Sequence, residues 1–325
     1  MMTKRSLAEI EELTRSALER HGAGHWQAGE VACAVALAEA RGNRICGLYY
    51  LESYCQQLTT GRVNGTVDPV VDRVRPGAVR VDAAYGFAQP AFMKAMPEAI
   101  DTARENGAAT LAVCHAHTCT SLGYFTEAIA RAGMIGMGFT NATPIVAAPG
   151  GAARVIGTNP FAFSVPDGSG EVAMQFDFST SAVALGKITM AKAAGEKIPT
   201  GWAVDANGAE TTDPDAALGG ALVSAGGHKG WGMGLMVEVL AAGMTGGLNS
   251  ADVSPLKAPN GGPHDLGQFY VLIDPSTSPD FANRFNRLAE VIRADSEARI
   301  PGSDLKMQDP VEVPDALWAL VSALA

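Results

Sequence analysis

The sequence predicts an α/β fold in which a central mixed sheet is flanked by helical parts. Helical periodicity dominates the chain before residue 60, strand-like patterns begin near residue 63, and helical periodicity returns after residue 280. The 325 residues are 47% hydrophobic and 18% charged, which is an ordinary globular composition. A chain of this length holds one large domain or two to three smaller ones.

The N-terminal part is expected to be helical. Apolar residues recur with helical spacing over 6–20, and Gly22 and Gly24 end this helix. Two further helices are predicted at 29–41 and at 49–58.

Strands and helices alternate through the middle of the chain. We predict strands within 63–90, at 108–117, at 134–141 and within 155–178, and helices at 90–106, 121–132, 181–194 and 229–244. The stretch 198–228 is rich in Gly, Asp and Thr and is expected to be mostly irregular. A strand at 266–275 and helices at 280–293 and 314–325 complete the pattern.

Composition excludes several classes of function. The net charge of −10 argues against nucleic-acid binding and against a polybasic membrane patch. No run of about 18 apolar residues is present, so we expect no membrane span. Five cysteines without a CxxC pair favour reduced thiols and a cytoplasmic protein. His115 and His117 alternate on a predicted strand, so we expect them to share one face with a spacing that can chelate a metal. No third ligand has a clear spacing, so we expect no metal site.

Glycine-rich and hydroxyl-rich stretches are candidates for binding a phosphate. A GxGxxG fingerprint and a P-loop are both missing. The segment GGHKG (226–230) opens a predicted helix, where free N–H groups and the cation Lys229 could hold an anion. It is equally typical of a glycine-rich turn with a solvated lysine. DFSTS (177–181) and GTNP (157–160) are either helix caps and turns or ligand loops.

Seven stretches in order resemble the malate/L-lactate dehydrogenase type 2 family, which includes ureidoglycolate and sulfolactate dehydrogenases, diketogulonate reductase and piperideine-2-carboxylate reductase. They are GRVNG (61–65), VDAAYGFAQP (81–90), LGYFTEAIARAGMIGMGFTNATP (122–144), GTNPFAFSVP (157–166), DFSTSAVALGKI (177–188), IPTGWAVDANGAETTDP (198–214) and GGHKGWGMGLMVEVL (226–240). Any one of them is a weak signal, but together they span nearly the whole chain.

The resemblance implies an oxidoreductase that uses NAD or NADP and carries a hydride to or from C2 of a small carboxylate. That substrate is a 2-oxo or 2-hydroxy acid such as malate, lactate or sulfolactate, or a cyclic imine bearing a carboxylate. The resemblance also implies a non-Rossmann mixed-sheet cofactor domain, chain ends packed together, and a homodimer with the active site at its interface. We accordingly divide the chain into a helical part (1–75) packing with 290–325, an α/β cofactor-binding core (76–245), and a strand with C-terminal helices (246–325).

Residues carried over by motif give the predicted cofactor site. They are Asn141, Asp177, Phe178, Ser179, Thr180, His228, Lys229 and Gly230, with Pro301, Gly302 and Ser303 added from the PGSD stretch at 301–304.

The chain departs from the family where proton transfer is expected. Many members have Ser-His-Gly near the end of the second helix, with an arginine four residues after the histidine; here Cys46 replaces that histidine and Tyr50 that arginine. A second family histidine is replaced by Thr118, one residue after His117. Cys46, Tyr50, His117 and Thr118 are therefore our candidates for substrate and proton handling.

Three hypotheses follow from these replacements. In the first, His117 or His115 replaces the lost acid, although neighbouring strand residues face opposite ways unless a bulge intervenes. In the second, which we favour narrowly, the substrate is a cyclic imine that already bears its proton. In the third, the chain binds a ligand without turning it over.

Overall fold

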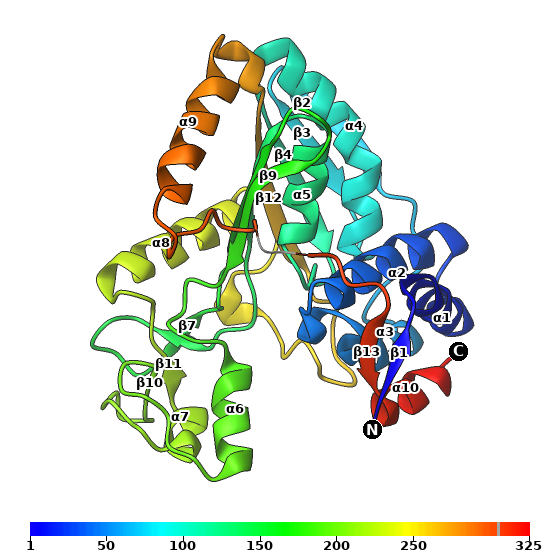
Figure 1. Cartoon of the computed structure of the whole chain (residues 1–325). Helices are drawn as coiled ribbons and strands as arrows, with labels where there is room; N and C mark the ends of the chain where they lie inside the picture. The colour runs from blue at the N-terminus through cyan, green and yellow to red at the C-terminus, as the bar shows by residue number, and fades with distance from the viewer. Residues whose placement is uncertain (304–305) are drawn as a thin grey trace.

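A seven-stranded mixed sheet forms the centre of the molecule (Figure 1). The computed structural model describes residues 1–303 and 306–325. The strand order is β2-β3-β4-β12-β5-β8-β9. The bounds are β2 Val70–Arg75, β3 Ala78–Asp82, β4 Ala108–Ala116, β5 Ile135–Thr140, β8 Phe161–Pro166, β9 Val172–Phe178 and β12 Leu266–Ile273. The pair β3 and β4 is parallel, and the other neighbours in this sheet are antiparallel. The fold is thus mixed α/β, as predicted.

Two helices cover one face of the sheet. They are α4 (Ala88–Asn106) and α5 (Gly123–Arg131), and their apolar sides form the largest buried cluster with β3, β4 and β12. Rings of Phe92, Phe125 and Tyr270 meet edge to face or tilted at the centre of this cluster. On the other face, Val237 of α8 (His228–Glu238) packs on aromatic residues of β5 and β12. The last long helix, α9 (Phe281–Arg293), follows β12.

The two ends of the chain meet beside a bundle of N-terminal helices. Strand β1 (Met2–Arg5) pairs antiparallel with β13 (Val311–Pro314), and both termini lie on this side in Figure 1. The helices here are α1 (Leu7–Arg20), α2 (His25–Ala40), α3 (Leu51–Thr59) and α10 (Asp315–Ser322). The capping box that the Ser6 and Glu9 side chains form sets the start of α1.

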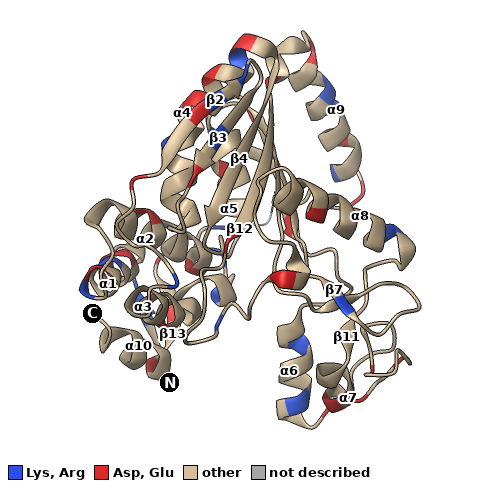
Figure 2. Ribbon diagram, turned by 180° about the vertical axis from the view of Figure 1, so that it is seen from behind, with Lys and Arg blue, Asp and Glu red and all other residues tan. Residues whose placement is uncertain are grey.

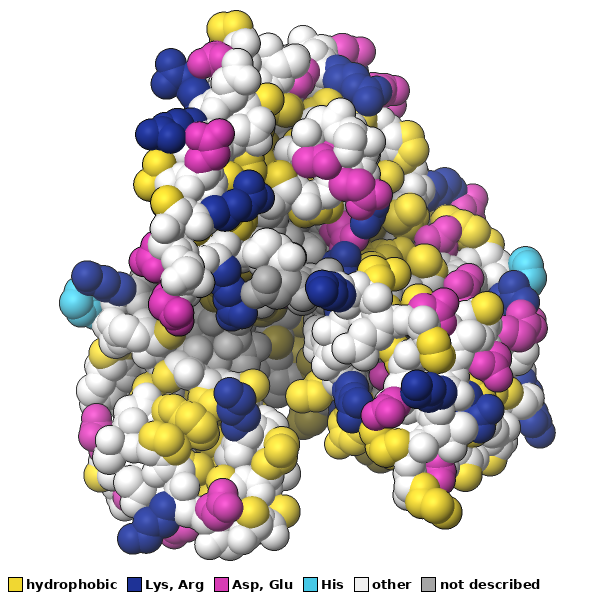
Figure 3. Space-filling model, viewed as in Figure 1, with side chains coloured by type: hydrophobic (Ala, Val, Ile, Leu, Met, Phe, Trp, Pro, Cys, Tyr) yellow, Lys and Arg dark blue, Asp and Glu magenta, His cyan; other side chains and the backbone are white. Residues whose placement is uncertain are grey.

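A second, smaller sheet builds a separate lobe below the central sheet. Its strands, in the order β10-β11-β6-β7, are Ala203–Val204, Ala221–Leu222, Val146–Ala147 and Arg154–Ile156. Helices α6 (Leu185–Ala194) and α7 (Pro214–Gly219) pack together here. Figure 3 shows the surface hollowed between this lobe and the N-terminal helices.

Most predicted elements agree with the structure, but the sequence did not indicate the short strands β1, β6 and β13, and two predicted helices differ in extent. The stretch 198–228 is mostly irregular, as predicted, but it also holds the short elements β10, α7 and β11. Those strands have two residues each, which is too short for a periodic pattern, and α7 begins with the turn-like pair Asp213 and Pro214, in which Asp213 caps the helix. The helix predicted at 181–194 begins only at Leu185. The one predicted at 229–244 ends at Glu238 and continues as a π-turn over Val239–Gly243.

The central sheet takes strands from all three predicted domains. Strand β2 precedes residue 76 and β12 follows residue 245, and both belong to this sheet. The division at these two boundaries stays a prediction.

The surface carries mixed charge. Figure 2 shows acidic and basic residues interspersed on the outer helices, including α1, α4 and α9. Within residues 1–303 and 306–325, no helix has both the length and the apolar character that crossing a bilayer requires.

Candidate active site

The turn after α2 carries Cys46 and Tyr50. Two short 3-10 turns, Arg44–Cys46 and Leu48–Tyr50, lead into α3. The buried carboxylate of Glu39 accepts a hydrogen bond from the backbone N–H of Leu48 at 2.8 Å. Gly47 lies so close to this carboxylate that a Cβ there would collide with it. The last turn of α2 therefore determines where Cys46 and Tyr50 are placed.

Neither side chain is ionised at neutral pH. Burial, together with the nearby Asp177 carboxylate, raises the pKa of the Cys46 thiol to about 12. Burial also raises the pKa of Tyr50 to about 12. The Tyr50 hydroxyl is buried and has no hydrogen-bond partner among the described residues. Its ring meets Tyr54 edge to face at 4.9 Å between centroids.

The end of β4 directs its two histidines to different partners. His115 has a left-handed backbone (φ 50°), which breaks the alternation of the strand. Its Nδ1 lies 2.8 Å from Oδ1 of Asp265, and the imidazole is partly exposed. His117 lies beyond the last residue of β4 and is 1% exposed. The expectation that both histidines share one strand face is therefore wrong.

His117 belongs to a buried polar cluster with Gln57 and His264. Its Nε2 lies 2.5 Å from Oε1 of Gln57, and its ring stacks on His264 with 4.0 Å between centroids. Tyr54 connects this cluster to Tyr50, because the Tyr54 ring lies 5.6 Å from that of His117. The backbone N–H of Thr118 donates to Nδ1 of His264 at 3.3 Å. Tyr50, His117 and Thr118 are thus brought together, and Cys46 lies near both Tyr50 and Asp177.

Hydrogen bonds assign the protons on both rings. The Nε2 of Gln57 donates to the carbonyl oxygen of Leu256 at 2.7 Å, so Oε1 of Gln57 faces His117 and accepts from it. The proton of His117 is therefore on Nε2, and its Nδ1 keeps a lone pair without a partner in the described chain. His264 donates from Nε2 to Leu256 and accepts at Nδ1.

The cluster keeps both histidines neutral. Burial, the neighbouring ring and the cation Arg62 lower the pKa of His117 well below its ordinary value. Burial and Arg62 lower the pKa of His264 to about 3.

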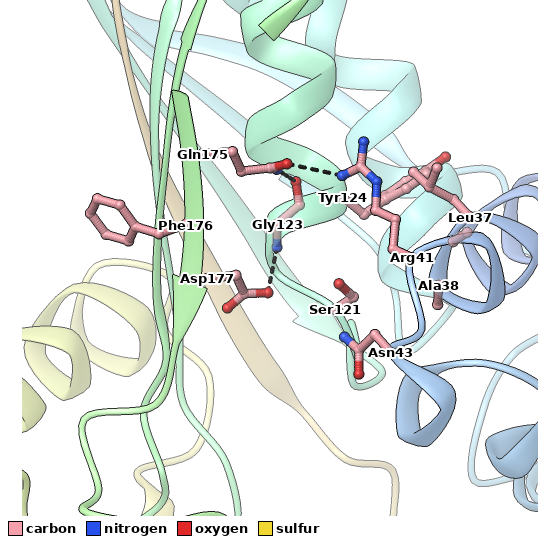
Figure 4. A pocket seen from close by; sticks show the side chains of 11 residues that line it. Leu37, Ala38, Arg41, Asn43, Ser121, Gly123, Tyr124, Gln175, Phe176 and Asp177 are labelled. Atoms are coloured by element: carbon pink, nitrogen blue, oxygen red, sulfur yellow. Dashed lines mark hydrogen bonds between the residues drawn. The ribbon is translucent and has the colours of Figure 1, made fainter. Parts of the chain in front are cut away.

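A pocket of about 180 Å³ opens between α2, α5 and β9 (Figure 4). Asn43, Ser121 and Asp177 line it, and Oδ2 of Asp177 accepts from the Gly123 N–H at 2.7 Å, at the start of α5. Arg41 forms an ion pair with Glu127 at its edge. Asp177, a predicted cofactor residue, thus also caps a helix next to Cys46.

The three loops predicted to bind the cofactor converge. The Thr180 N–H donates to the Thr158 carbonyl at 2.9 Å, and the Ala225 N–H donates to the Thr180 carbonyl at 2.9 Å. Gly234 of α8 lies against Thr180, where a Cβ would meet the Thr180 hydroxyl at 3.1 Å. DFSTS, GTNP and GGHKG therefore form one surface, with Ser179 and Phe178 at the end of β9.

The start of α8 is shaped for an anion. Gly226 and Gly227 have φ of 64° and 63°, a backbone that favours glycine, and they turn the chain into α8 at His228. His228 and Lys229 are exposed at this N-terminus, and Gly230 is buried behind them. A cavity of about 400 Å³ lies against the two glycines. First-turn N–H groups beside a lysine suit a phosphate group.

The remaining predicted cofactor residues lie at the end of β5 and beside β9. Nδ2 of Asn141 donates to Leu248 at 2.8 Å, whereas its buried Oδ1 has no partner in the described chain. The carbonyl of Pro301 accepts from the Gln175 N–H at 3.0 Å, and Gly302 packs on the same residue. Ser303 follows directly, and residue 304 of the PGSD stretch lies outside the described residues.

Four residues that the sequence did not single out complete the site. Gln57 and His264 hold His117, while Arg62 and Lys257 bring positive charge to Tyr50. Arg62 stands within GRVNG, so the motif marked its segment but not its role. His264 and Lys257 lie in an irregular loop with no periodicity or motif to indicate them.

The chain is similar to known proteins over nearly its whole length. The family model described as malate/L-lactate dehydrogenase matches residues 6–309. A Δ1-pyrroline-2-carboxylate reductase from Ancylobacter novellus is 37% identical over 98% of this chain and 96% of its own length. A (2R)-3-sulfolactate dehydrogenase (NADP⁺) from Chromohalobacter salexigens is 38% identical over 92% of this chain and 89% of its own.

A solved structure extends the likeness to three dimensions. The Δ1-piperideine-2-carboxylate reductase from Pseudomonas syringae pv. tomato superposes with a TM-score of 0.89 at 32% identity, over 99% of this chain and 100% of that one. Relatives of this kind are dehydrogenases and reductases, which implies a nicotinamide cofactor. The chain therefore belongs to the malate/L-lactate dehydrogenase family of oxidoreductases.

Proposed function

We propose that this protein reduces a five- or six-membered cyclic imine bearing a carboxylate at C2, such as Δ1-pyrroline-2-carboxylate or Δ1-piperideine-2-carboxylate. The relatives from A. novellus and P. syringae, which act by name on these imines, support the substrate class. A reduced nicotinamide cofactor supplies the hydride when bound.

The observation that carries this proposal is the lack of a proton donor at both positions where the family commonly has histidine. Cys46 keeps its proton tightly, with a pKa of about 12, and Thr118 does not titrate near neutrality. A ketone that gains a hydride becomes an alkoxide and needs an acid. A protonated imine becomes a neutral amine and needs none.

His117 does not replace the missing acid. To donate a proton toward a substrate it would first have to be protonated at Nδ1, because its Nε2 proton is held by Gln57. Burial and the neighbouring Arg62 disfavour that cation. The hypothesis in which His117 supplies the proton is therefore the weaker one, and His115 is engaged with Asp265.

The described residues fit a nicotinamide dinucleotide. The exposed start of α8 suits its phosphates, with Lys229 as the counter-charge. The unpartnered Oδ1 of Asn141 suits a carboxamide N–H donor. We propose that Asp177, Phe178, Ser179, Thr180, His228, Gly230, Pro301, Gly302 and Ser303 complete this site. The mostly antiparallel central sheet supports a non-Rossmann mode of binding, since a Rossmann site needs parallel strands at a switch point.

We propose a cytoplasmic homodimer. Helices α8 and α9 each leave apolar side chains in water, among them Val239 at the end of α8 (64% exposed), and Leu288 and Val291 (55% each). Apolar surface of this extent is typical of a surface that another chain covers.

The test is a cofactor-oxidation assay with NADH and with NADPH. The substrates are Δ1-pyrroline-2-carboxylate, Δ1-piperideine-2-carboxylate, pyruvate, oxaloacetate and sulfopyruvate, and cofactor binding is measured in parallel by calorimetry. We expect turnover of the two imines, and the same assay gives the cofactor preference. Absence of turnover with all five, alongside cofactor binding, would instead support a ligand-binding member of the family without activity.

A second candidate is the reduction of a 2-oxo acid. It is favoured by the 38% identity to the sulfolactate dehydrogenase. The assay separates the two, since this candidate requires sulfopyruvate or another 2-oxo acid to be the best substrate.

A further inference from the structure

Arg62 is a fully buried cation that is not paired with an acid. Its exposed fraction is 0%, and no carboxylate in the described chain lies within ion-pair distance. Its guanidinium donates to three backbone carbonyls of one loop: Gly262 at 2.9 Å, Ala258 at 2.6 Å and Pro255 at 3.3 Å. Its Nη2 has no partner there. Arg62 thus fastens the loop 255–262 beside Tyr50.

The fastened loop brings a second cation to Tyr50. The Nζ of Lys257 lies 4.0 Å from the ring centroid of Tyr49 and 4.9 Å from that of Tyr50. No acid of the described chain forms an ion pair with Lys257. Partial burial lowers the pKa of Lys257, and the nearby Glu52 carboxylate opposes this shift without cancelling it.

The residue at position 50 suggests what Lys257 could bind. An arginine that is common in the family is replaced there by Tyr50, whose buried hydroxyl lies near Ser53 and Gln57 without a well-formed hydrogen bond to any described residue. A hydroxyl donor on a ring and an ammonium beside the same ring together offer what an arginine offers alone: a hydrogen bond and a positive charge for one carboxylate.

We propose that Lys257, with the Tyr50 hydroxyl, binds the carboxylate of the substrate, and that Arg62 is the positioning residue that holds the Lys257 loop in place. This inference rests on the proposed function, since it takes the ligand to be a small ring bearing a carboxylate. It makes Lys257 a determinant of specificity for the carboxylate and gives it no part in proton transfer.

The test uses binding, so that it does not depend on turnover. Calorimetry measures the affinity of pyridine-2-carboxylate, a planar ring of substrate size, and of its neutral amide, each to the full-length protein saturated with NADP⁺ or NAD⁺. We expect Lys257→Met to lower the affinity for the carboxylate about 10- to 100-fold, as the loss of a charge-assisted hydrogen bond does. The affinity for the amide should be unchanged.

Three further variants separate recognition from structure. Lys257→Arg should retain most of the affinity, and Tyr50→Arg in the Lys257→Met background should restore it. The matched control is Lys94→Met on α4, which removes an ion pair to Asp68 and should leave the affinity of both ligands unchanged. Arg62→Gln should lower the affinity for the carboxylate and leave that for the amide unchanged. Circular dichroism checks that each variant is folded.

Several results would overturn the proposal. They are equal carboxylate affinity in wild type and Lys257→Met, equal losses for carboxylate and amide, or a wild-type protein that does not distinguish the two ligands. The proposed function fails separately, if the wild type binds the carboxylate through Lys257 and yet does not reduce any imine.

Discussion

Nε2 of His117 donates a hydrogen bond to Oε1 of Gln57 across 2.5 Å, and this bond determines that Nδ1 of His117 keeps its lone pair. The Nε2 of Gln57 is itself bound to the Leu256 carbonyl, so a reversed amide would place its oxygen against that carbonyl and lose this bond. A histidine held in this way is a neutral side chain of the pocket wall. This relationship is why we assign the proton to the substrate.

Gln57→Leu should destabilise the protein. It leaves the buried Nε2 of His117 without a partner and removes one of the two hydrogen bonds to the Leu256 carbonyl. A buried group left unpaired costs about 1–3 kcal/mol of unfolding free energy. Urea unfolding measures it. The neighbouring Gln56 is exposed, and Gln56→Leu should stay within about 0.5 kcal/mol of wild type. Equal effects of the two substitutions would show that the buried bond is not formed.

Stability should fall as the pH is lowered from 7 to 5. The folded pKa of His264, about 3, lies below its ordinary value of 6.5, so its contribution is fully present above pH 6.5 and is lost as the pH falls toward 3. The loss is about 2 kcal/mol over this interval, at 1.4 kcal/mol per pH unit below 6.5. Urea unfolding of His264→Gln at both pH values should show a smaller decrease than wild type. The control variant is His25→Gln, at an exposed histidine. If the unfolding free energy of His264→Gln depended on pH as that of wild type does, His264 would not be the source of the loss.

Lys229→Ala should weaken nicotinamide cofactor binding about 10- to 150-fold, because a phosphate contact from a charged donor contributes roughly 1.5–3 kcal/mol. The fold should be intact, since Lys229 is exposed at the start of α8. Calorimetry measures the cofactor affinity of Lys229→Ala, with Lys4→Ala on β1 as the control. Unchanged affinity in Lys229→Ala would remove Lys229 from the site.

Cys46→Ser should retain at least about a tenth of wild-type kcat/KM, because a thiol with a pKa of about 12 lines the pocket without exchanging protons. Steady-state kinetics on the preferred imine measures it. A loss of about 10²- to 10⁴-fold, the contribution of a true acid or base, would show instead that Cys46 transfers the proton.

Sequence patterns predicted the long elements well and the contacts of the site poorly. Strong periodicity indicated α1, α4 and β12 within a few residues. The pairing of Lys4 with Glu312 joins segments from opposite ends of the chain, and four-residue strands give no clear pattern.

The partners of His117 were also not predicted, because they are far from it in the sequence. His264 reaches it from an irregular loop, and the left-handed backbone at His115 is not visible in an alternating pattern. The motifs located the cofactor loops because those loops are contiguous segments. The site cluster is assembled from three separate segments, so no single contiguous motif indicates it.

The most direct test of imine reduction is the pH dependence of kcat and kcat/KM for Δ1-piperideine-2-carboxylate and for pyruvate, in wild type and in His117→Ala. We predict that the imine is the better substrate, that its kcat/KM follows the protonation of the imine itself, and that His117→Ala costs less than about 10-fold in folded protein, well below the 10²–10⁴-fold of a true acid. Pyruvate as the better substrate, with kcat falling as the pH rises through a histidine-like pKa and a loss of about 10²-fold or more in His117→Ala, would contradict it.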